Sequence, residues 1–219
     1  PVQSLSFTGP SADTLMLAKT RGVHVESGLS FLERLSGRVH MRDLRSSYLI
    51  FGAGFSCGPT YRVTRRALDV LGALLLLTLA APVLALTALA VKLDSPGPVL
   101  FRQRRLGKDD KPFMMNKLRS MCENAESKSG AVFTSENDDR ITRVGYFIRR
   151  TRLDELPQLW NVLVGDMSLV GPRAERPEFA ETLREIYPYY ALRATVRPGV
   201  TGWAQTRYGY VNSVEGYEE

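Results

Sequence analysis

The chain has 219 residues, enough for one domain and part of a second. Its formal net charge of +6 favours an anionic partner, and composition does not choose between nucleic acid, an acidic membrane surface and phosphorylated substrates. The two cysteines, Cys57 and Cys122, match no metal-ligand spacing and form no disulfide framework, so we expect a reduced, cytoplasmic setting. The chain begins at Pro1 without an initiator methionine or a signal-peptide pattern, and we interpret it as a fragment of a longer protein.

Residues 1–60 contain too little apolar sequence to fold alone. The expected elements are a helical turn at 14–19, a short strand at 23–25 and a helix at 27–37. The histidines, His24 and His40, have no metal-ligand spacing around them, and we expect both to be structural or exposed. We interpret this segment as the end of a larger α/β regulatory domain, followed by a linker.

Residues 67–91 are the strongest compositional feature of the chain. They are apolar except at Asp69, Gly72, Thr78, Pro82 and Thr87. These 25 residues exceed the ~20 that a bilayer-spanning helix needs. A spanning helix is therefore the first interpretation, and a buried helix of a soluble domain is less compatible with so long an apolar run.

Two observations favour a re-entrant helix over a spanning one. Basic residues flank both ends, whereas the positive-inside rule places the excess on one side; they are Arg62, Arg65 and Arg66 before the segment and Lys92, Arg102, Arg104 and Arg105 after it. Pro82 lies near the middle, where it removes a backbone hydrogen bond and bends a helix. We predict a membrane helix at about 64–92 that turns at Pro82 and leaves the membrane on the face by which it entered.

The remainder of the chain mixes short strands with helices, which predicts an α-rich α/β domain over residues 61–219 with amphipathic helices at the membrane interface. The expected strands lie at 99–101, at 113–121 and directly after Gly165; the expected helices are 122–137 in part, 140–150, one from Pro157 to Gly165, and 178–190. On the strand at 113–121, Lys117 and Arg119 share one face. Three tyrosines near the end of the last helix fit either core packing or a membrane interface.

The run at 149–161 carries the chemistry. Asp154 and Glu155 precede Pro157, which suits the first turn of a helix, so both carboxylates lie near a helix N-terminus, where phosphates and their metals are favoured. Neighbouring residues on a helix point about 100° apart, so these are not a facing acid/base pair. One carboxylate could attack a substrate while the other holds a cation. The alternative is a helix cap with surface ion pairs.

Single arginines at Arg149, Arg173 and Arg197 lie in structured or Gly/Pro-turn contexts, which is typical of side chains that converge on a bound anion. A divalent cation held by carboxylate and phosphate oxygens would complete such a site, and the cations would lower the pKa of the attacking carboxylate. The sequence contains no P-loop or Rossmann glycine signature, no Ser/His/Asp or Cys/His nucleophile set and no nucleic-acid-binding motif.

From about Tyr61 onward the chain resembles the bacterial sugar transferase family, the monotopic phosphoglycosyl transferases. The matching motifs lie in order at 94–98, 101–103, 117–121, 138–142, 153–162, 165–173 and 197–205. The forms at 151–155 and 203–208 are similar to those of long, exopolysaccharide-type members that begin with glucose 1-phosphate or galactose 1-phosphate. The chain departs from the family pattern at Arg152, often serine in smaller members, and at Asp139 and Ala174, where proline is common.

The resemblance implies a re-entrant membrane helix and transfer of a sugar 1-phosphate from a nucleotide diphosphate sugar, a UDP-hexose, to polyprenyl (undecaprenyl) phosphate. This would be the first membrane step of exopolysaccharide, O-antigen or capsule synthesis, in the cytoplasmic leaflet of the bacterial inner membrane. It further implies that Asp154 is a covalent nucleophile and Glu155 a Mg²⁺ ligand. The implied phosphate-binding residues are Arg149, Arg173 and Arg197, with Lys117 and Arg119 as further candidates.

The expected partners are these two substrates, membrane lipids and a second copy of the chain in a homodimer, and nucleic acid is not expected. Two alternatives come from other classes: a non-catalytic, membrane-anchored scaffold for polysaccharide assembly, and a basic nucleic-acid binder, for which the apolar segment has no use.

Overall fold

The computed structural model describes residues 11–37, 49, 58–123, 125, 138–187 and 189–208, in two compact units, Pro1–Gly52 and Ala53–Glu219. The described part of the first unit holds two helices, α1 (Ala12–Thr20) and α2 (Gly28–Ser36). The expected turn at 14–19 is thus part of a longer helix. The helix predicted at 27–37 is confirmed: the Ser27 hydroxyl accepts from the Ser30 N–H, and Gly37, with φ 66°, ends it.

The strand predicted at 23–25 is wrong, because these residues join α1 to α2 without strand pairing. Val23 and Val25 are 56% and 36% exposed, so no apolar face favours a strand there. His24 is exposed, as expected, whereas His40, Cys57 and most of the helix expected at 122–137 lie outside the described residues. Cys122 is a free, exposed thiol.

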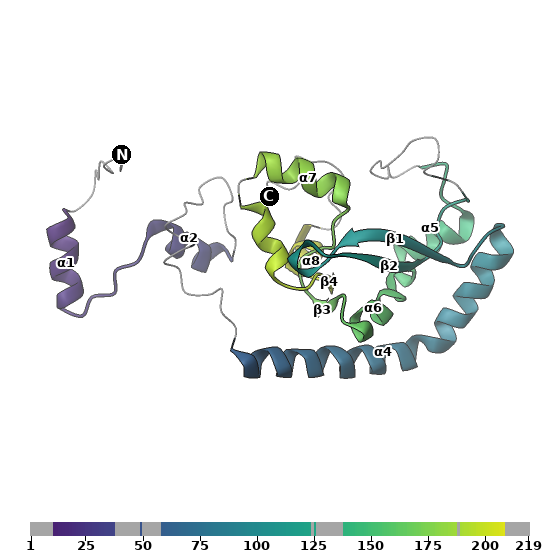
Figure 1. The fold of residues 1–219 in the computed structure, drawn as a ribbon, viewed down its shortest axis with the longest axis horizontal. Helices are drawn as coiled ribbons and strands as arrows, with labels where there is room; N and C mark the ends of the chain where they lie inside the picture. The colour runs from purple at the N-terminus through teal and green to yellow at the C-terminus, as the bar shows by residue number, and fades with distance from the viewer. Residues whose placement is uncertain are drawn as a thin grey trace. The chain divides into compact units, whose positions relative to one another are not determined.

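The second unit is an α-rich α/β domain, as predicted (Figure 1). In chain order its elements are α4 (Pro59–Asp94), β1 (Leu100–Leu106), β2 (Pro112–Leu118), α5 (Arg143–Arg150), α6 (Gln158–Val164), β3 (Ser168–Val170), α7 (Pro177–Ile186), β4 (Gly199–Thr201) and α8 (Trp203–Tyr208). Short 3₁₀ turns lie at Lys108–Asp110, Leu153–Glu155 and Tyr190–Thr195.

The four strands of the described residues form two small sheets. β1 and β2 pair antiparallel, with Leu100 opposite Leu118, and β3 pairs parallel with β4, with Ser168 opposite Gly199. The β4 stretch has the composition of a turn, and it becomes a strand because glycine permits close approach to β3. A Cβ at Gly199 would lie 2.1 Å from the Gly171 nitrogen. The two Gly/Pro turns that precede Arg173 and follow Arg197 are therefore held together.

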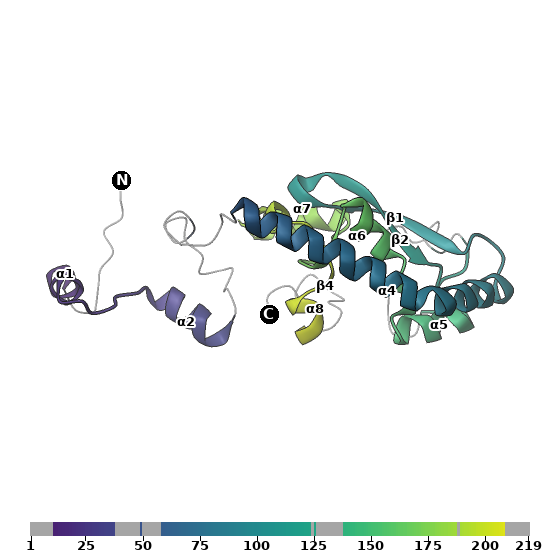
Figure 2. The same cartoon turned by 90° about the horizontal axis from the view of Figure 1, so that it is seen from below.

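The apolar segment forms α4, a single helix of 36 residues that continues through Pro82. Figures 1 and 2 show this helix bending toward its C-terminal part. Pro82 is its only interior proline, and it leaves the Thr78 carbonyl without the usual donor. The structure thus has one bent helix, whereas we predicted a helix that turns at Pro82. That α4 enters and leaves the membrane on the same face stays a prediction.

Most of the apolar surface of α4 is exposed. Leu71, Leu75, Leu79 and Leu86 are 61–70% exposed, and only 6% of the most apolar window is buried. The interpretation as a buried helix of a soluble domain is therefore wrong. By length and composition α4 is able to cross a membrane.

Polar side chains fasten the N-terminal part of α4 to the rest of the domain. Asp69, 6% exposed, accepts from the Ser168 hydroxyl at 2.9 and 2.8 Å and from the Leu169 N–H at 2.9 Å. Arg65 donates to the Val170 carbonyl at 2.7 Å. Arg66 donates to the last carbonyls of α6, those of Val162 and Leu163, at 2.6 and 2.8 Å. These flanking arginines therefore anchor the helix as well as adding charge.

A second set of bonds holds the C-terminal end of α4 to the same domain. The Asp94 carboxylate accepts from the Val144 N–H at 3.0 Å, at the start of α5. The buried Arg119 guanidinium donates to the Val91 carbonyl at 3.2 Å and to the carbonyl and hydroxyl of Ser95 at 2.6 and 2.9 Å. Both ends of the apolar helix are thus fixed to one polar domain.

Two apolar clusters complete the core. One contains Ala73, Met115, Leu159, Val162, Met167 and Ala174, and the other contains Val91, Leu118 and Ile148. Each cluster includes one residue of α4, so the helix also contributes to the core. Tyr187 and Tyr190 are 5% and 8% exposed. These two tyrosines therefore pack in the core and do not lie at a membrane interface.

We predict that Asp69→Ala lowers the free energy of unfolding by about 2–4 kcal/mol, because the Ser168 hydroxyl and the Leu169 N–H lose their acceptor. Asp69→Asn keeps one acceptor oxygen and should cost less. The measurement is thermal or chemical unfolding in detergent. Glu181→Ala, at an exposed position of α7, is the control and should change stability by less than about 0.5 kcal/mol. Equal effects of Asp69→Ala and the control would contradict the assignment.

Candidate functional site

The two carboxylates predicted as the reactive pair lie in the 3₁₀ turn Leu153–Glu155, directly before α6. Pro157 is the N-cap of that helix, so both side chains lie at its N-terminal side, as predicted. Arg152 enters the turn in the left-handed conformation, with φ 62° and ψ 14°. Asp154 is 6% exposed.

Buried polar bonds on α6 fix the turn against the β1–β2 hairpin. The Asn161 side-chain oxygen accepts from the backbone and side-chain nitrogens of Asn116, each at 3.0 Å. Its side-chain nitrogen donates to the Met114 carbonyl at 2.8 Å. Asn161 is 2% exposed, so these bonds replace those it would form with water. They set the position of β2 relative to the carboxylates.

Lys117 on β2 faces the pair. Its Nζ lies 3.1 Å from Glu155 Oε1, and both side chains are more than four-fifths buried. Burial lowers the pKa of the Lys117 ammonium, and the charges of Glu155 and Asp154 oppose that effect. The ion pair with Glu155 therefore holds the Lys117 amino group beside the two carboxylates.

Burial raises the pKa of Asp154 to about 6, and the charge of Glu155 adds to the rise. The charges of Lys117, Arg149 and Arg152 act in the opposite direction. The cations act in the direction we expected, and desolvation, which the sequence does not give, outweighs their attraction. Within the described residues Asp154 Oδ1 is buried and has no hydrogen-bond partner.

This oxygen and the adjacent Glu155 carboxylate fit a divalent cation. A buried carboxylate oxygen without a donor is the kind of ligand that Mg²⁺ binds, and Mg²⁺ in phosphate-transfer sites takes one or two carboxylates and completes its shell with phosphate oxygens and water. The described part of the chain contains no group of three His, Cys, Asp or Glu residues, so the protein would supply two ligands at most from these types.

Two of the predicted phosphate-binding arginines lie close enough to the pair to affect its charges. Arg149 lowers the pKa of Asp154, and Arg173 lowers the pKa of Lys117. The Arg173 Nε lies 4.0 Å from Glu175 Oε1, and the Arg173 carbonyl accepts from Arg193 at 2.6 Å. The chain segment that carries Arg173 is therefore held in place beside the carboxylates.

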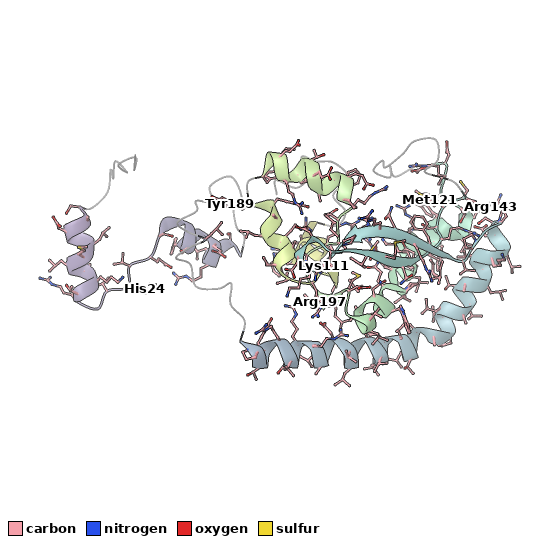
Figure 3. The ribbon with its side chains drawn as sticks, in the orientation of Figure 1. His24, Lys111, Met121, Arg143, Tyr189 and Arg197 are labelled. Atoms are coloured by element: carbon pink, nitrogen blue, oxygen red, sulfur yellow. The ribbon has the colours of Figure 1, made fainter. Side chains whose placement is uncertain are left out.

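The structure does not bring Arg197 or Arg119 to the same place. Arg197, labelled in Figure 3, donates through Nε to the Gly165 carbonyl at 2.8 Å, at the end of α6 opposite the carboxylates. Arg119 donates to the end of α4. Neither lines the cavity beside Glu155. Sequence spacing does not distinguish Arg197 from a phosphate ligand, because both occur next to glycine and proline turns. For Arg119, the strand position predicts which face the side chain lies on but not which group it binds.

A cavity of about 660 Å³ opens beside Glu155. Its lining contains both charged and apolar side chains. It comprises Leu76, Leu79, Ala80, Arg152, Glu155, Leu156, Leu159, Leu169, Arg173, Val200, Thr201 and Gln205. The first three belong to α4, so the apolar helix forms one wall of the site. We did not predict Arg152 or this wall. The position of Arg152 two residues before Asp154 was the available signal for the former.

Residues 60–219 match the family model described as bacterial sugar transferase. The chain belongs to the bacterial sugar transferase family. Within this family it is 45% identical, over 81% of its length, to UDP-N-acetylgalactosamine-undecaprenyl-phosphate N-acetylgalactosaminephosphotransferase of Aeromonas hydrophila, of which it covers 41%. It is 51% identical, over 66% of its length, to UDP-glucose:undecaprenyl-phosphate glucose-1-phosphate transferase of Escherichia coli K12, of which it covers 31%.

A third member of the sugar transferase family is shorter. The chain is 50% identical, over 61% of its length, to the putative undecaprenyl-phosphate N-acetylgalactosaminyl 1-phosphate transferase of Bacillus subtilis, and it covers 74% of that protein. The chain thus spans less than half the length of the first two relatives and about three quarters of the third.

We predict opposite stability effects for the two carboxylates. Because the pKa of Asp154 is about 6 in the folded protein and 3.8 in the unfolded chain, ionised Asp154 costs about 3 kcal/mol of stability above pH 6, and this cost disappears as pH falls to about 4. Asp154→Asn should therefore raise the thermal midpoint at pH 7.5 and leave it nearly unchanged at pH 4.

Glu155→Gln should lower the midpoint at pH 7.5, because Lys117 loses its partner. Both variants are measured by thermal unfolding in detergent across this pH range, without added Mg²⁺. A lower thermal midpoint for Asp154→Asn at pH 7.5 would show that the ionised Asp154 carboxylate does not destabilise the folded protein.

Proposed function

We propose that this chain carries the catalytic part of a transferase that moves a sugar 1-phosphate from a nucleotide diphosphate sugar, a UDP-hexose, to polyprenyl phosphate. The observation that carries the proposal is the buried Asp154 carboxylate, one oxygen of which has no hydrogen-bond partner among the described residues. Its neighbour Glu155 lines a cavity that the exposed apolar helix α4 also lines. Such a site fits two anionic reactants, one soluble and one from the bilayer. Relatives named for UDP-sugar and undecaprenyl-phosphate reactants support the same reaction.

The proposed reaction has two displacements at one phosphorus atom. An Asp154 carboxylate oxygen bonds to the phosphorus attached to the sugar, and the bond from that phosphorus to the bridging oxygen breaks, so nucleoside monophosphate leaves with the electron pair. A phosphate oxygen of the lipid then bonds to the same phosphorus. The acyl-phosphate bond breaks and the Asp154 carboxylate is restored. The first step requires an ionised carboxylate, because the attacking oxygen supplies the electron pair of the new bond. With a pKa of about 6, the Asp154 carboxyl is mostly ionised above pH 6.

Charge neutralisation is the main task of the surrounding residues. A carboxylate and a pyrophosphate repel each other, and the rate depends on cations fixed where negative charge develops. Arg149 and Arg173 would hold phosphate oxygens, and Lys117 would keep Glu155 and Asp154 in place. When bound through Glu155, Mg²⁺ would supply further neutralisation of the phosphate oxygens. Arg119 and Arg197 would reach a phosphate only after giving up their bonds to α4 and α6.

We further propose that α4 is re-entrant and that the domain lies on the cytoplasmic face of the inner membrane. Both ends of the helix bond to the same charged domain, through Asp69 and Asp94, so a spanning helix would draw one of these contacts into the bilayer. Exposed apolar residues on neighbouring helices would rest in the interface, as expected for amphipathic helices. They are Tyr146 and Phe147 on α5 and Trp160 and Val164 on α6, all 58–61% exposed.

The names of the relatives do not agree on the donor sugar. Two of the three named above carry N-acetylgalactosamine in their names and one carries glucose, whereas the sequence forms at 151–155 and 203–208 favour glucose or galactose. The donors to compare are therefore the UDP derivatives of glucose, galactose and N-acetylgalactosamine.

We predict that the purified protein, incubated with Mg²⁺ and the correct donor but no lipid, gains the mass of one sugar phosphate and releases one equivalent of nucleoside monophosphate. Intact mass spectrometry reads the adduct, and its mass separates a hexose from an N-acetylhexosamine. Asp154→Asn should show neither adduct nor release. Release of nucleotide by Asp154→Asn at the parent rate would remove the covalent step.

The same experiment tests the competing function, a non-catalytic scaffold for polysaccharide assembly. A scaffold would keep the fold but form no adduct with any donor, with or without polyprenyl phosphate. The intact carboxylate pair and the raised pKa of Asp154 disfavour a scaffold, because a buried charge that lowers stability has no structural use there.

For the membrane topology we predict that single cysteines at Tyr61 and Leu93, near the two ends of α4, label from the same side. The background replaces Cys57 and Cys122 with serine, and both labelled positions are more than half exposed. A membrane-impermeant maleimide should modify both cysteines in inside-out vesicles and neither in intact spheroplasts. Glu181→Cys marks the side of the catalytic domain. Labelling of Tyr61→Cys and Leu93→Cys from opposite sides would establish a spanning helix.

A further inference from the structure

Arg152 adopts a backbone conformation that its side chain does not favour. Its φ of 62° is in the left-handed region, which costs non-glycine residues about 1 kcal/mol and is usually occupied by glycine or asparagine. Residues kept in such conformations concentrate at functional sites. Here the strained residue directly precedes the turn that carries Asp154 and Glu155.

The Arg152 side chain lines a cavity that contains both charged and apolar side chains. It lines the cavity together with Glu155 and Arg173, and Leu76, Leu79 and Ala80 of α4 line the same cavity. The cavity therefore combines the Arg152 guanidinium and the Glu155 carboxylate with apolar side chains of α4.

We propose that this cavity is the acceptor site, in which Arg152 binds the phosphate of an isoprenoid lipid and the leucines of α4 contact its first isoprene units. This inference rests on the proposed function and adds the residues that recognise the second substrate. Arg152 is then a substrate-binding residue, and the strain at its backbone is the cost of aiming a long cation into the cavity.

The apolar wall is what assigns the cavity to the lipid. A nucleotide diphosphate sugar is polar along its whole length, and a wall of leucines offers it no hydrogen bonds. An isoprenoid phosphate has one anionic end and an apolar chain, which is the combination that Arg152 and α4 present. Leu79 is 67% exposed without a ligand, so covering it with an isoprene unit is favourable.

The test measures binding to the Asp154→Asn protein, in which chemistry cannot proceed, with farnesyl phosphate and farnesol as probes. Arg152→Asn removes the cation while tolerating the left-handed backbone, and it should weaken farnesyl phosphate binding about tenfold or more while leaving farnesol unchanged. Arg152→Lys should recover part of the loss. Arg150→Asn, an exposed arginine at the end of α5 outside the cavity, is the matched control and should change neither affinity.

A second pair of variants tests the apolar wall. Leu79→Ser should weaken farnesyl phosphate and farnesol in parallel, by about fivefold. Leu86→Ser is the control, because Leu86 is exposed to the same degree on the same helix and does not line the cavity. Thermal midpoints of all variants establish that each is folded before its affinity is compared.

The outcomes separate this inference from the proposed function. If the parent forms no sugar-phosphate adduct but Asp154→Asn binds farnesyl phosphate through Arg152, the reaction is wrong and the lipid site stands. If adducts form but Arg152→Asn binds farnesyl phosphate as the parent background does, the acceptor assignment is overturned. It is also overturned if Arg152→Asn, in an otherwise unchanged protein at pH 8, slows adduct formation from the donor while the acceptor KM stays the same.

Discussion

Removing a carboxylate from water costs free energy that only neighbouring cations, donors or metal ions can offset, and Asp154 is held under this constraint. Its burial outweighs the attraction of Lys117, Arg149 and Arg152, so the pKa of the carboxyl remains about 6. A carboxylate that was fully neutralised by protein groups would be a poorer nucleophile. In the proposed reaction, incomplete neutralisation would leave an oxygen that a metal ion and a substrate phosphate could approach together.

The apolar helix α4 lines the cavity of the site, and by length and composition it is also able to cross a membrane. Asp69 and Asp94 join its two ends to β3 and α5, and its leucines form one wall of the cavity beside Glu155. If α4 lies in the bilayer as proposed, the depth of the helix also sets the depth of the site. The proposed reaction, which joins a soluble donor to a membrane-bound acceptor, requires that depth to be close to the head groups.

Local sequence signals predicted the elements better than the contacts between them. The helix that begins at Pro157 and ends at Gly165, and the strand that carries Lys117, follow from turn residues and alternation of side chains. The strand β4 was not predictable, because its pairing depends on glycines at positions 171 and 199 meeting across the chain. The effect of the cations on the pKa of Asp154 was predicted in the right direction, but the larger opposing effect was missed, because the sequence does not give the burial of a carboxylate.

The arginines show why charge alone is a weak guide to partners. Arg65, Arg66 and Arg119 donate to backbone carbonyls at helix ends or strand ends, where a guanidinium offsets carbonyls that lack partners. Arg149 and Arg173 instead act on the charged groups of the site. Part of the net charge of +6 therefore stabilises the fold, and only the remainder is available to an anion. The net charge, which would favour a nucleic-acid partner, includes arginines of both kinds, whereas only Arg152 and Arg173 line the cavity.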